Sequence, residues 1–355
     1  MHDVYMKKAL ELASKGGINV KPNPLVGAVI VKNGRLIGEG YHQTYGEAHA
    51  EIEAFDHAIE DVQGATMYVT LEPCSHRGKT GSCAKQIIEK GIKEVYVATL
   101  DPNPLVSGKG IQMLKDAGII VHVGLFQKES DALNKHFYHF ITQNKPYVLL
   151  KMALTLDGKY ATDQYESNWI TNAQSREDVH HIRAQYQAII VGIHTVIQDN
   201  PKLNVRLEGY QKKQPIRIVL DSNGSIPIKS QLIQDDLETW VIVNSISDNK
   251  KQMIESRGKR IIHLNQLGKI DLDTMLKTLH EEGIQNVMVE GGKTLHESFL
   301  REQLFDEIQA YIAPNFIGGH QSIQNLNITS MKEALTLKDV QFQIFDDNIK
   351  ITGRK

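Results

Sequence analysis

The sequence predicts an α/β protein of two domains, residues 1–144 and 145–355, each with its own core. A length of 355 residues suits two domains, because a domain usually has ~100–200 residues. Apolar strand patterns alternate with helical patterns along the chain, which is typical of layered α/β folds. A second series of predicted strands and helices begins after Asn144-Lys145-Pro146, which places the domain boundary there.

The first domain is expected to form a mixed sheet covered by helices. An amphipathic helix at 4–15 ends at Gly16-Gly17, because glycine commonly stops a helix. Strands at 25–32 and 36–41 are joined by Asn33-Gly34, a strong hairpin signal. The remaining elements are a helix at 49–60, a strand at 66–71, a helix at 84–90, a strand at 94–100, a helix near 112–116 and a strand at 119–123.

The second domain opens with a long apolar strand at 147–156 that ends in the turn signal Asp157-Gly158. Its further elements are strands at 188–192, 216–220, 239–243, 286–290 and 307–313, with helices near 175–186, 272–281 and 294–301. Residues 245–270 are too mixed in character for an assignment.

The amino-acid composition limits the kinds of molecule that the protein is expected to bind. Forty basic and 42 acidic side chains leave a formal charge of −2, so the chain lacks the basic footprint of a nucleic-acid-binding protein. No apolar run approaches the ~18 residues of a membrane span, and the N-terminus lacks the apolar core of a signal peptide. We therefore expect a cytoplasmic protein that acts on neither nucleic acid nor membrane.

Both cysteines of the chain lie close together in sequence, and a His-x-Glu triplet precedes them. Cys74 and Cys83 are separated by eight residues, and His49-Ala50-Glu51 lies upstream. One imidazole and two thiolates can hold zinc with the fourth position left for water, whose pKa zinc lowers to ~7. The carboxylate of Glu51, which is no ligand, would then move the protons. The pattern resembles the H-x-E and P-C-x-x-C signature of nucleobase deaminases, although the cysteine spacing is wider.

Other interpretations of these residues exist. A His-x-Glu triplet arises by chance in a chain with 15 histidines, and two cysteines can be small buried apolar residues or form a local disulfide. The conjunction of Pro73-Cys74 with His49-Ala50-Glu51 in this order favours the zinc site.

Three further motifs of the second domain could bind a ligand, and each also has an ordinary structural explanation. The segment from Val289 to Thr294 runs from a buried strand through Gly291-Gly292 into a helix. Free amides at such a helix start favour a phosphate, but a tight turn explains the glycines equally well. Asp199-Asn200-Pro201 followed by Arg206 would ordinarily be a polar turn with a solvated arginine, and Trp169 a core residue.

Together these phrases resemble the bifunctional riboflavin-biosynthesis deaminase/reductase over nearly the whole chain. The phrases similar to its deaminase half are Lys21-Pro22-Asn23-Pro24-Leu25-Val26-Gly27, His49-Ala50-Glu51, Pro73-Cys74-Ser75-His76 and Asp101-Pro102-Asn103-Pro104. Those similar to its reductase half are the segments 151–158, 169–171, 191–206, 290–292 and 313–319. The wide cysteine spacing matches this family. Thr80-Gly81-Ser82-Cys83 departs from its frequent Thr-Pro-Pro-Cys, which should loosen the loop but removes no donor atom.

The resemblance implies a cytidine-deaminase-like three-layer α/β/α domain followed by a dihydrofolate-reductase-like α/β domain. The first would bind one zinc and remove the 2-amino group of 2,5-diamino-6-ribosylamino-4(3H)-pyrimidinone 5′-phosphate as ammonia. The second would use NADPH to reduce the ribosyl group to ribityl, which gives 5-amino-6-ribitylamino-uracil 5′-phosphate. It also implies a small-molecule, phosphorylated pyrimidine as the partner and a homo-oligomer, dimer or tetramer, formed through the reductase domain.

The resemblance further assigns binding residues. Zinc would be held by His49, Cys74 and Cys83, with Glu51 catalytic. The deaminase substrate would contact Asn23, His42, His76, Lys79, Asp101 and Asn103. NADPH would contact Ala153, Trp169, Thr195, Asp199, Ser222, Gly292, Lys293, Thr294, Leu295, His296, Glu297 and Ser298. The reductase substrate would contact Ser167, Arg183, Leu203, Arg206 and Glu290, with the two arginines as bidentate phosphate clamps.

Two other function classes are weighed against this one. A nucleic-acid base deaminase with an unrelated appended domain would need a basic, aromatic-rich surface, and the aromatic content is only 6%. A zinc-stabilised, non-catalytic regulatory module would usually close its metal site with four protein ligands, and it would have no use for Glu51.

Overall fold

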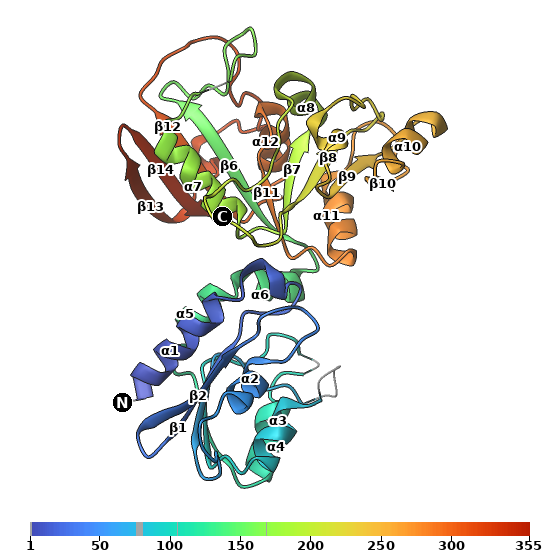
Figure 1. Ribbon diagram of the computed structural model, residues 1–355. Coiled ribbons are helices and arrows are strands. Elements are labelled where there is room, and N and C mark those ends of the chain that lie inside the picture. Colours follow the sequence, from blue (N-terminus) through green and yellow to red (C-terminus); the bar gives the residue numbers. More distant parts are fainter. Residues whose placement is uncertain (1, 76–80, 105, 168) are drawn as a thin grey trace. The chain divides into compact units, whose positions relative to one another are not determined.

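The computed structural model describes residues 2–75, 81–104, 106–167 and 169–355 (Figure 1). The chain divides into two compact units between Asn144 and Lys145. Each unit is described by itself below.

The first unit contains a five-stranded mixed sheet in the order β2-β1-β3-β4-β5. Its strands are β1 (Gly27–Lys32), β2 (Arg35–Tyr41), β3 (Thr66–Val69), β4 (Glu94–Val97) and β5 (Ile120–Val123). β1 pairs antiparallel with β2 and β3, whereas β3, β4 and β5 run parallel. The carboxyl ends of β3 and β4 therefore meet at one edge of the sheet.

Helices cover both faces of this sheet. They are α1 (His2–Ser14), the 3-10 turn η1 (Gly17–Val20), α2 (Ala50–Asp56), α3 (Cys83–Glu89), α4 (Lys109–Asp116), α5 (Gln127–Leu133) and α6 (Lys135–Gln143). Alternate residues of β1 face opposite ways: Val29 packs with α1, whereas Ala28 and Ile30 pack with α2, α3 and α4. The three-layer arrangement predicted for this domain is confirmed.

The second unit contains a nine-stranded sheet in the order β10-β9-β8-β7-β11-β6-β12-β14-β13. Its strands are β6 (Tyr147–Thr155), β7 (Ala188–Gly192), β8 (Ile216–Leu220), β9 (Thr239–Val243), β10 (Arg260–His263), β11 (Asn286–Val289), β12 (Glu307–Ala313), β13 (Lys338–Phe345) and β14 (Asn348–Arg354). The sheet is parallel from β10 to β12, and the two last strands are antiparallel.

Helices lie on both faces of the second sheet as well (Figure 1). They are α7 (Ala173–Arg183), α8 (Ile193–Asp199), α9 (Gln231–Gln234), α10 (Asp248–Glu255), α11 (Leu272–Glu281), α12 (Lys293–Arg301) and the 3-10 turn η2 (Met331–Glu333). α11 and α12 pack on one face, and α7 to α10 pack on the other. No helix of the described residues is long and apolar enough to cross a membrane.

Some predicted elements differ from the observed ones. The helix predicted at 49–60 ends at Asp56, because the chain turns back and the Ile59 amide donates to the Ile37 carbonyl at 2.8 Å. The strands predicted at 66–71 and 94–100 end at Val69 and Val97. The segment left unassigned, 245–270, contains α10 and β10.

Candidate active sites

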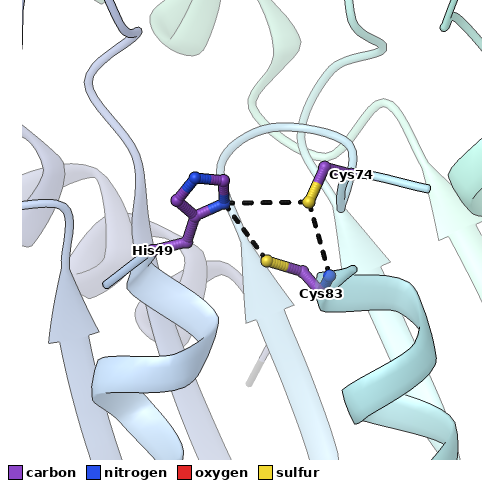
Figure 2. A group of neighbouring side chains, drawn as sticks. All are labelled: His49, Cys74 and Cys83. Atoms are coloured by element: carbon purple, nitrogen blue, oxygen red, sulfur yellow. Dashed lines mark hydrogen bonds between the residues drawn. The ribbon is translucent and has the colours of Figure 1, made fainter. Parts of the chain in front are cut away.

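The structure of the first unit brings His49, Cys74 and Cys83 together (Figure 2). His49 Nδ1 lies 3.2 Å from Cys83 Sγ and 3.7 Å from Cys74 Sγ. The Cys83 amide donates to Cys74 Sγ at 3.3 Å, and the donor atoms of all three residues lie within 4.8 Å of one another. One imidazole and two sulfurs at this spacing fit a three-ligand zinc site.

Helix starts position two of these donors. His49 is the residue before α2, with an extended backbone, and Glu51 lies in the first turn of that helix. Cys83 is the first residue of α3. Residues two apart diverge on a regular helix, so His49 and Glu51 share a site only because His49 lies just outside it.

Gly81 and Ser82 lie directly before Cys83 and fix the start of α3. Gly81 has a φ of +86°, which proline cannot adopt. Ser82 caps α3 by accepting from the Lys85 amide at 3.3 Å, and its hydroxyl donates to the Cys74 carbonyl at 2.9 Å. Ser82 therefore fixes Cys83 through a helix cap.

The electrostatic surroundings of Glu51 and the thiols suit proton transfer and metal binding. Burial raises the pKa of the Glu51 carboxyl to about 7, against the opposing effect of His49. The hydrogen bond from Cys83, and a further one from His49, lowers the pKa of the Cys74 thiol, whereas the hydrogen bond with Cys74 and burial raise the pKa of the Cys83 thiol. A thiolate is the form that binds metal, so Cys74 is the sulfur favoured as a thiolate before a metal binds.

A cavity of about 430 Å³ opens next to this cluster. His49, Glu51 and Cys74 line it together with four of the predicted substrate residues, which are Asn23, His42, Asp101 and Asn103. The other two, His76 and Lys79, lie outside the described residues. A cavity with several converging polar groups is the usual form of a small-molecule site.

His42 fixes the orientation of Asn23 in this cavity. The His42 ring contacts the Ala48 carbonyl through Nδ1 at 2.9 Å and the Asn23 amide nitrogen through Nε2 at 3.0 Å. Burial lowers the pKa of His42, which favours the neutral ring. Nδ1 then donates to Ala48 and Nε2 accepts from Asn23.

In the second unit the predicted residues gather at the carboxyl edge of the parallel strands. Ala153 lies near the end of β6, Thr195 follows β7, Ser222 follows β8 and Glu290 follows β11. Ligands of open α/β sheets bind at this edge. The strand order thus brings together residues that are far apart in sequence.

A buried ion pair lies at the centre of that edge. Arg183 donates to both carboxylate oxygens of Glu290, at 2.6 and 2.8 Å, and its third nitrogen donates to the Asn204 carbonyl at 3.1 Å. Burial alone would raise the pKa of Glu290, but Arg183 and then Lys151 lower it to about 2. Lys151, on β6, was not predicted as a site residue, because one lysine in an apolar strand has no distinctive pattern.

Arg206 lies beside this pair on a loop held by α7. Its backbone amide donates to His180 Nδ1 at 3.3 Å, and its guanidinium donates to Asn204 Oδ1 at 2.8 Å. Burial, with Arg183 and Arg206 next, lowers the pKa of His180 to about 4. The buried Leu203 precedes this segment. Sequence analysis missed His180, which belongs to no recognisable motif.

The start of α12 is open. Gly292 is the residue before the helix, and a Cβ added there would meet only Thr195 Oγ1, at 3.9 Å. A Cβ on Gly291 would instead lie 2.7 Å from Leu295 Cδ2. A phosphate can approach the amides that follow Gly292, because nothing fills that space.

The other predicted cofactor residues divide into two groups. Four side chains of the α12 segment make contacts within the protein. His296 is fully buried against the Val289 carbonyl and the Tyr160 hydroxyl. The other three contacts are those of Lys293 with the His320 carbonyl, Glu297 with the Gln324 amide and Ser298 with the Thr294 carbonyl. Near the loops, Ser167 donates to Asp199 at 3.4 Å, and Ser222 accepts from the Ile270 amide at 3.3 Å. Trp169 is 74% exposed and stacked under the Arg176 guanidinium. The alternative interpretation of Trp169 as a buried core residue is therefore wrong.

Comparison with known proteins also separates the chain into two parts. Residues 1–99 match the cytidine and deoxycytidylate deaminase zinc-binding region, and residues 146–351 match the RibD C-terminal domain. The riboflavin biosynthesis protein RibD of Aquifex aeolicus is 43% identical over 347 residues, covering 98% of this chain and 96% of the relative. That of Escherichia coli is 40% identical over 327 residues, covering 89% and 88%.

Solved structures give the same result. Acinetobacter baumannii RibD superposes with a TM-score of 0.91 at 38% identity, covering 99% of this chain and 98% of that one. The diaminohydroxyphosphoribosylaminopyrimidine deaminase/5-amino-6-(5-phosphoribosylamino)uracil reductase of Thermotoga maritima does so at 0.88 and 35%, with coverage of 99% and 98%. The chain belongs to the RibD family of riboflavin-biosynthesis proteins.

Proposed function

We propose that residues 1–144 deaminate the diaminopyrimidine 5′-phosphate and that residues 145–355 then reduce its ribosyl group with NADPH. The protein is thus a bifunctional deaminase and reductase of riboflavin biosynthesis. The observation that carries the proposal is the position of Glu51, which is 3% exposed and shares one cavity with His49 and Cys74.

In the deaminase unit His49, Cys74 and Cys83 would hold zinc. When bound, zinc supplies a water nucleophile at neutral pH. Glu51 would take a proton from the water as its oxygen adds to the pyrimidine carbon and pass that proton to the adjacent ring nitrogen. It would then carry the second proton of the same oxygen to the amino group, so that ammonia leaves and a carbonyl remains. A buried carboxyl that shares the cavity with His49 and Cys74 is placed to accept a proton and to donate it again.

The pocket residues would orient the ring and the phosphate. Asn23, fixed by His42, offers its amide to the edge of the pyrimidine. Asp101 and Asn103 line the same cavity and offer polar groups from the opposite loop. Their place beside Glu51 supports this role and makes the first unit a small-molecule site.

In the reductase unit the bound NADPH supplies the hydride. The amides after Gly292 would receive its diphosphate, with Thr195 and Ser222 beside them along the strand ends. Arg206 would receive the substrate phosphate. Arg183 already gives three donors to Glu290 and Asn204, so it holds Glu290 charged and in place.

A second copy of the chain would cover the edge of this sheet. Phe342 and Ile344 on β13 are 70% and 74% exposed, and alternate residues of a strand point to one face. Together with Val340 and Ile349, also exposed, they form an apolar stripe of the kind that marks a protein interface. We place the enzyme in the cytoplasm, where thiols such as Cys74 and Cys83 stay reduced.

The test of this function is the variant Glu51→Gln. The amide keeps the shape of the side chain but cannot move a proton, so ammonia release should fall ~10²–10⁴-fold. NADPH oxidation on separately supplied deaminated intermediate should persist at the wild-type rate. Metal analysis should find one zinc per chain in both proteins and none in the Cys74→Ser/Cys83→Ser variant. Deamination by Glu51→Gln within tenfold of wild type would show that Glu51 has another role.

A further inference from the structure

Glu72 is a buried carboxylate that the deamination chemistry does not use. It lies three residues after β3 and two residues before Cys74, and it is 6% exposed. Its Oε2 accepts from the amides of Gly108 and Asp101 at 2.9 and 3.3 Å. Its Oε1 accepts from the amides of Gly110 and Ile111 at 2.9 and 3.4 Å.

Buried charge is costly unless it is hydrogen-bonded, and here backbone amides provide all four of these bonds. Two of them, Gly110 and Ile111, belong to the first turn of α4, whose amides have no partner inside the helix. Gly108, the residue before α4, provides no side-chain cap. Glu72 therefore caps α4 from another part of the chain, and its negative charge suits that end of the helix.

Gly110 shows how closely α4 approaches the turn that carries Cys74. A Cβ added to Gly110 would lie 1.9 Å from the Pro73 carbonyl oxygen. Only glycine allows this backbone contact. The hydrogen bonds of Glu72, one of which comes from the Gly110 amide, and the contact of Gly110 with Pro73 attach the same segment to residues next to a zinc ligand.

The attached segment also carries two residues of the cavity. Asp101 and Asn103 line it with Glu51, and the Asn103 amide donates to Asp101 Oδ1 at 2.8 Å. Glu72 holds the Asp101 amide, so a displacement of its carboxylate moves both residues relative to Cys74.

We propose that Glu72 is a positioning residue that holds the Asp101–Asn103 side of the pocket in register with the zinc ligands. It acts through backbone amides and touches neither substrate nor metal. The inference rests on the proposed function in one respect, which is that Asp101 and Asn103 contact the pyrimidine substrate.

The variant Glu72→Gln tests it, because it keeps the size of the side chain and turns an amide NH₂ toward two backbone amides. Two of the four hydrogen bonds from backbone amides then lose their acceptor, so the Asp101–Asn103 side of the pocket is displaced and KM for the diaminopyrimidine should rise at least tenfold. We expect kcat within about threefold of wild type and an unchanged zinc content, because Glu51 and the ligands stay in place. Hydrogen exchange should accelerate in peptides covering 101–111.

Glu89→Gln is the matched control, because it makes the same chemical change at an exposed position of α3; its KM and exchange should equal those of wild type. Gly110→Ala is a second route to the same effect. It keeps the Glu72 side chain but forces α4 away from Pro73 and from Glu72 Oε1, which the new Cβ would approach to 3.3 Å. It should reproduce the rise in KM if Glu72→Gln fails to fold.

A double-mutant cycle separates positioning from general stability. If Glu72 acts through Asn103, Glu72→Gln should raise KM much less in an Asn103→Ala background than in wild type. Wild-type KM and exchange in Glu72→Gln, an equal rise in both backgrounds, or loss of zinc would each overturn the inference. If wild type releases no ammonia, the proposed function fails, whereas the exchange rates still report whether Glu72 holds the segment.

Discussion

The two adjacent glycines before α12 should respond to substitution in opposite ways. Gly292 has φ −75° and ψ −178°, an extended conformation that valine adopts readily. Among the described residues, a Cβ there meets only Thr195 Oγ1, at 3.9 Å, so Gly292→Val should leave the melting temperature unchanged or slightly higher. The same side chain would fill the space through which a diphosphate reaches the helix amides.

The expected cost to cofactor binding follows from the hydrogen bonds lost. A hydrogen bond from a backbone amide to a charged phosphate is worth ~1.5–3 kcal/mol, which corresponds to a rise in the NADPH Kd of roughly 10–150-fold per bond. The Kd is measured by calorimetric titration on the full-length protein. KM for deaminated intermediate, at saturating NADPH, should change little.

Gly291→Ala is the contrasting control. Its Cβ would lie 2.7 Å from Leu295 Cδ2 and 2.8 Å from Leu295 Cβ, so the turn must shift and the melting temperature should fall. If Gly292→Val binds NADPH as wild type does, or raises only the substrate KM, the cofactor diphosphate does not lie at α12.

Three further predictions address the second unit. Arg206→Ala should raise KM for the phosphorylated substrate at least tenfold and leave the NADPH Kd unchanged, because Arg206 provides a phosphate donor; steady-state kinetics with each substrate varied would reveal the opposite pattern. A fragment of residues 145–355 should bind NADPH and reduce deaminated intermediate without zinc, and it should sediment as an oligomer that Phe342→Asp dissociates; a monomeric or inactive parent fragment would contradict this. Burial lowers the pKa of His296 to about 4. Below pH ~6.5 this histidine therefore binds a proton in the unfolded chain but not in the folded state. Between pH 6.5 and 4 this should remove up to ~3 kcal/mol from the free energy of unfolding, and His296→Gln should lose less. Urea unfolding at the two pH values is followed by the fluorescence of Trp169 and Trp240, which both lie in the second unit.

Local signals in the sequence predicted much of the fold. Asn33-Gly34 predicted the β1–β2 hairpin, and both residues have positive φ, +52° and +75°, as this turn requires. The helix predicted at 272–281 coincides with α11, because Asp271 caps its start and its apolar residues repeat at helical spacing.

Elements without such signals were missed. β13 is exposed along nearly its whole length, and although Val340, Phe342 and Ile344 alternate with glutamines as in a strand, no turn signal or buried partner marked this segment. α5 and α6 follow one another directly through Asn134, and no glycine or proline separates them.

The site residues, too, differ in whether they could be predicted from the sequence. Residues that must be of one chemical type, such as His49, Cys74, Cys83 and Glu51, could be found from their spacing. Glu72 could not, because its partners are backbone amides that any sequence supplies. Its role becomes visible only when the fold brings the amides of Asp101, Gly108, Gly110 and Ile111 to its carboxylate.

The most direct test of the central claim is one anaerobic incubation of the zinc-loaded protein with the diaminopyrimidine 5′-phosphate and NADPH, in which ammonia and NADPH are followed together. The account predicts that ammonia release precedes NADPH oxidation and that the two reach equal amounts per substrate consumed. Without NADPH, ammonia release should continue and deaminated intermediate should accumulate. NADPH oxidation without prior ammonia release, or release of neither product, would contradict the account.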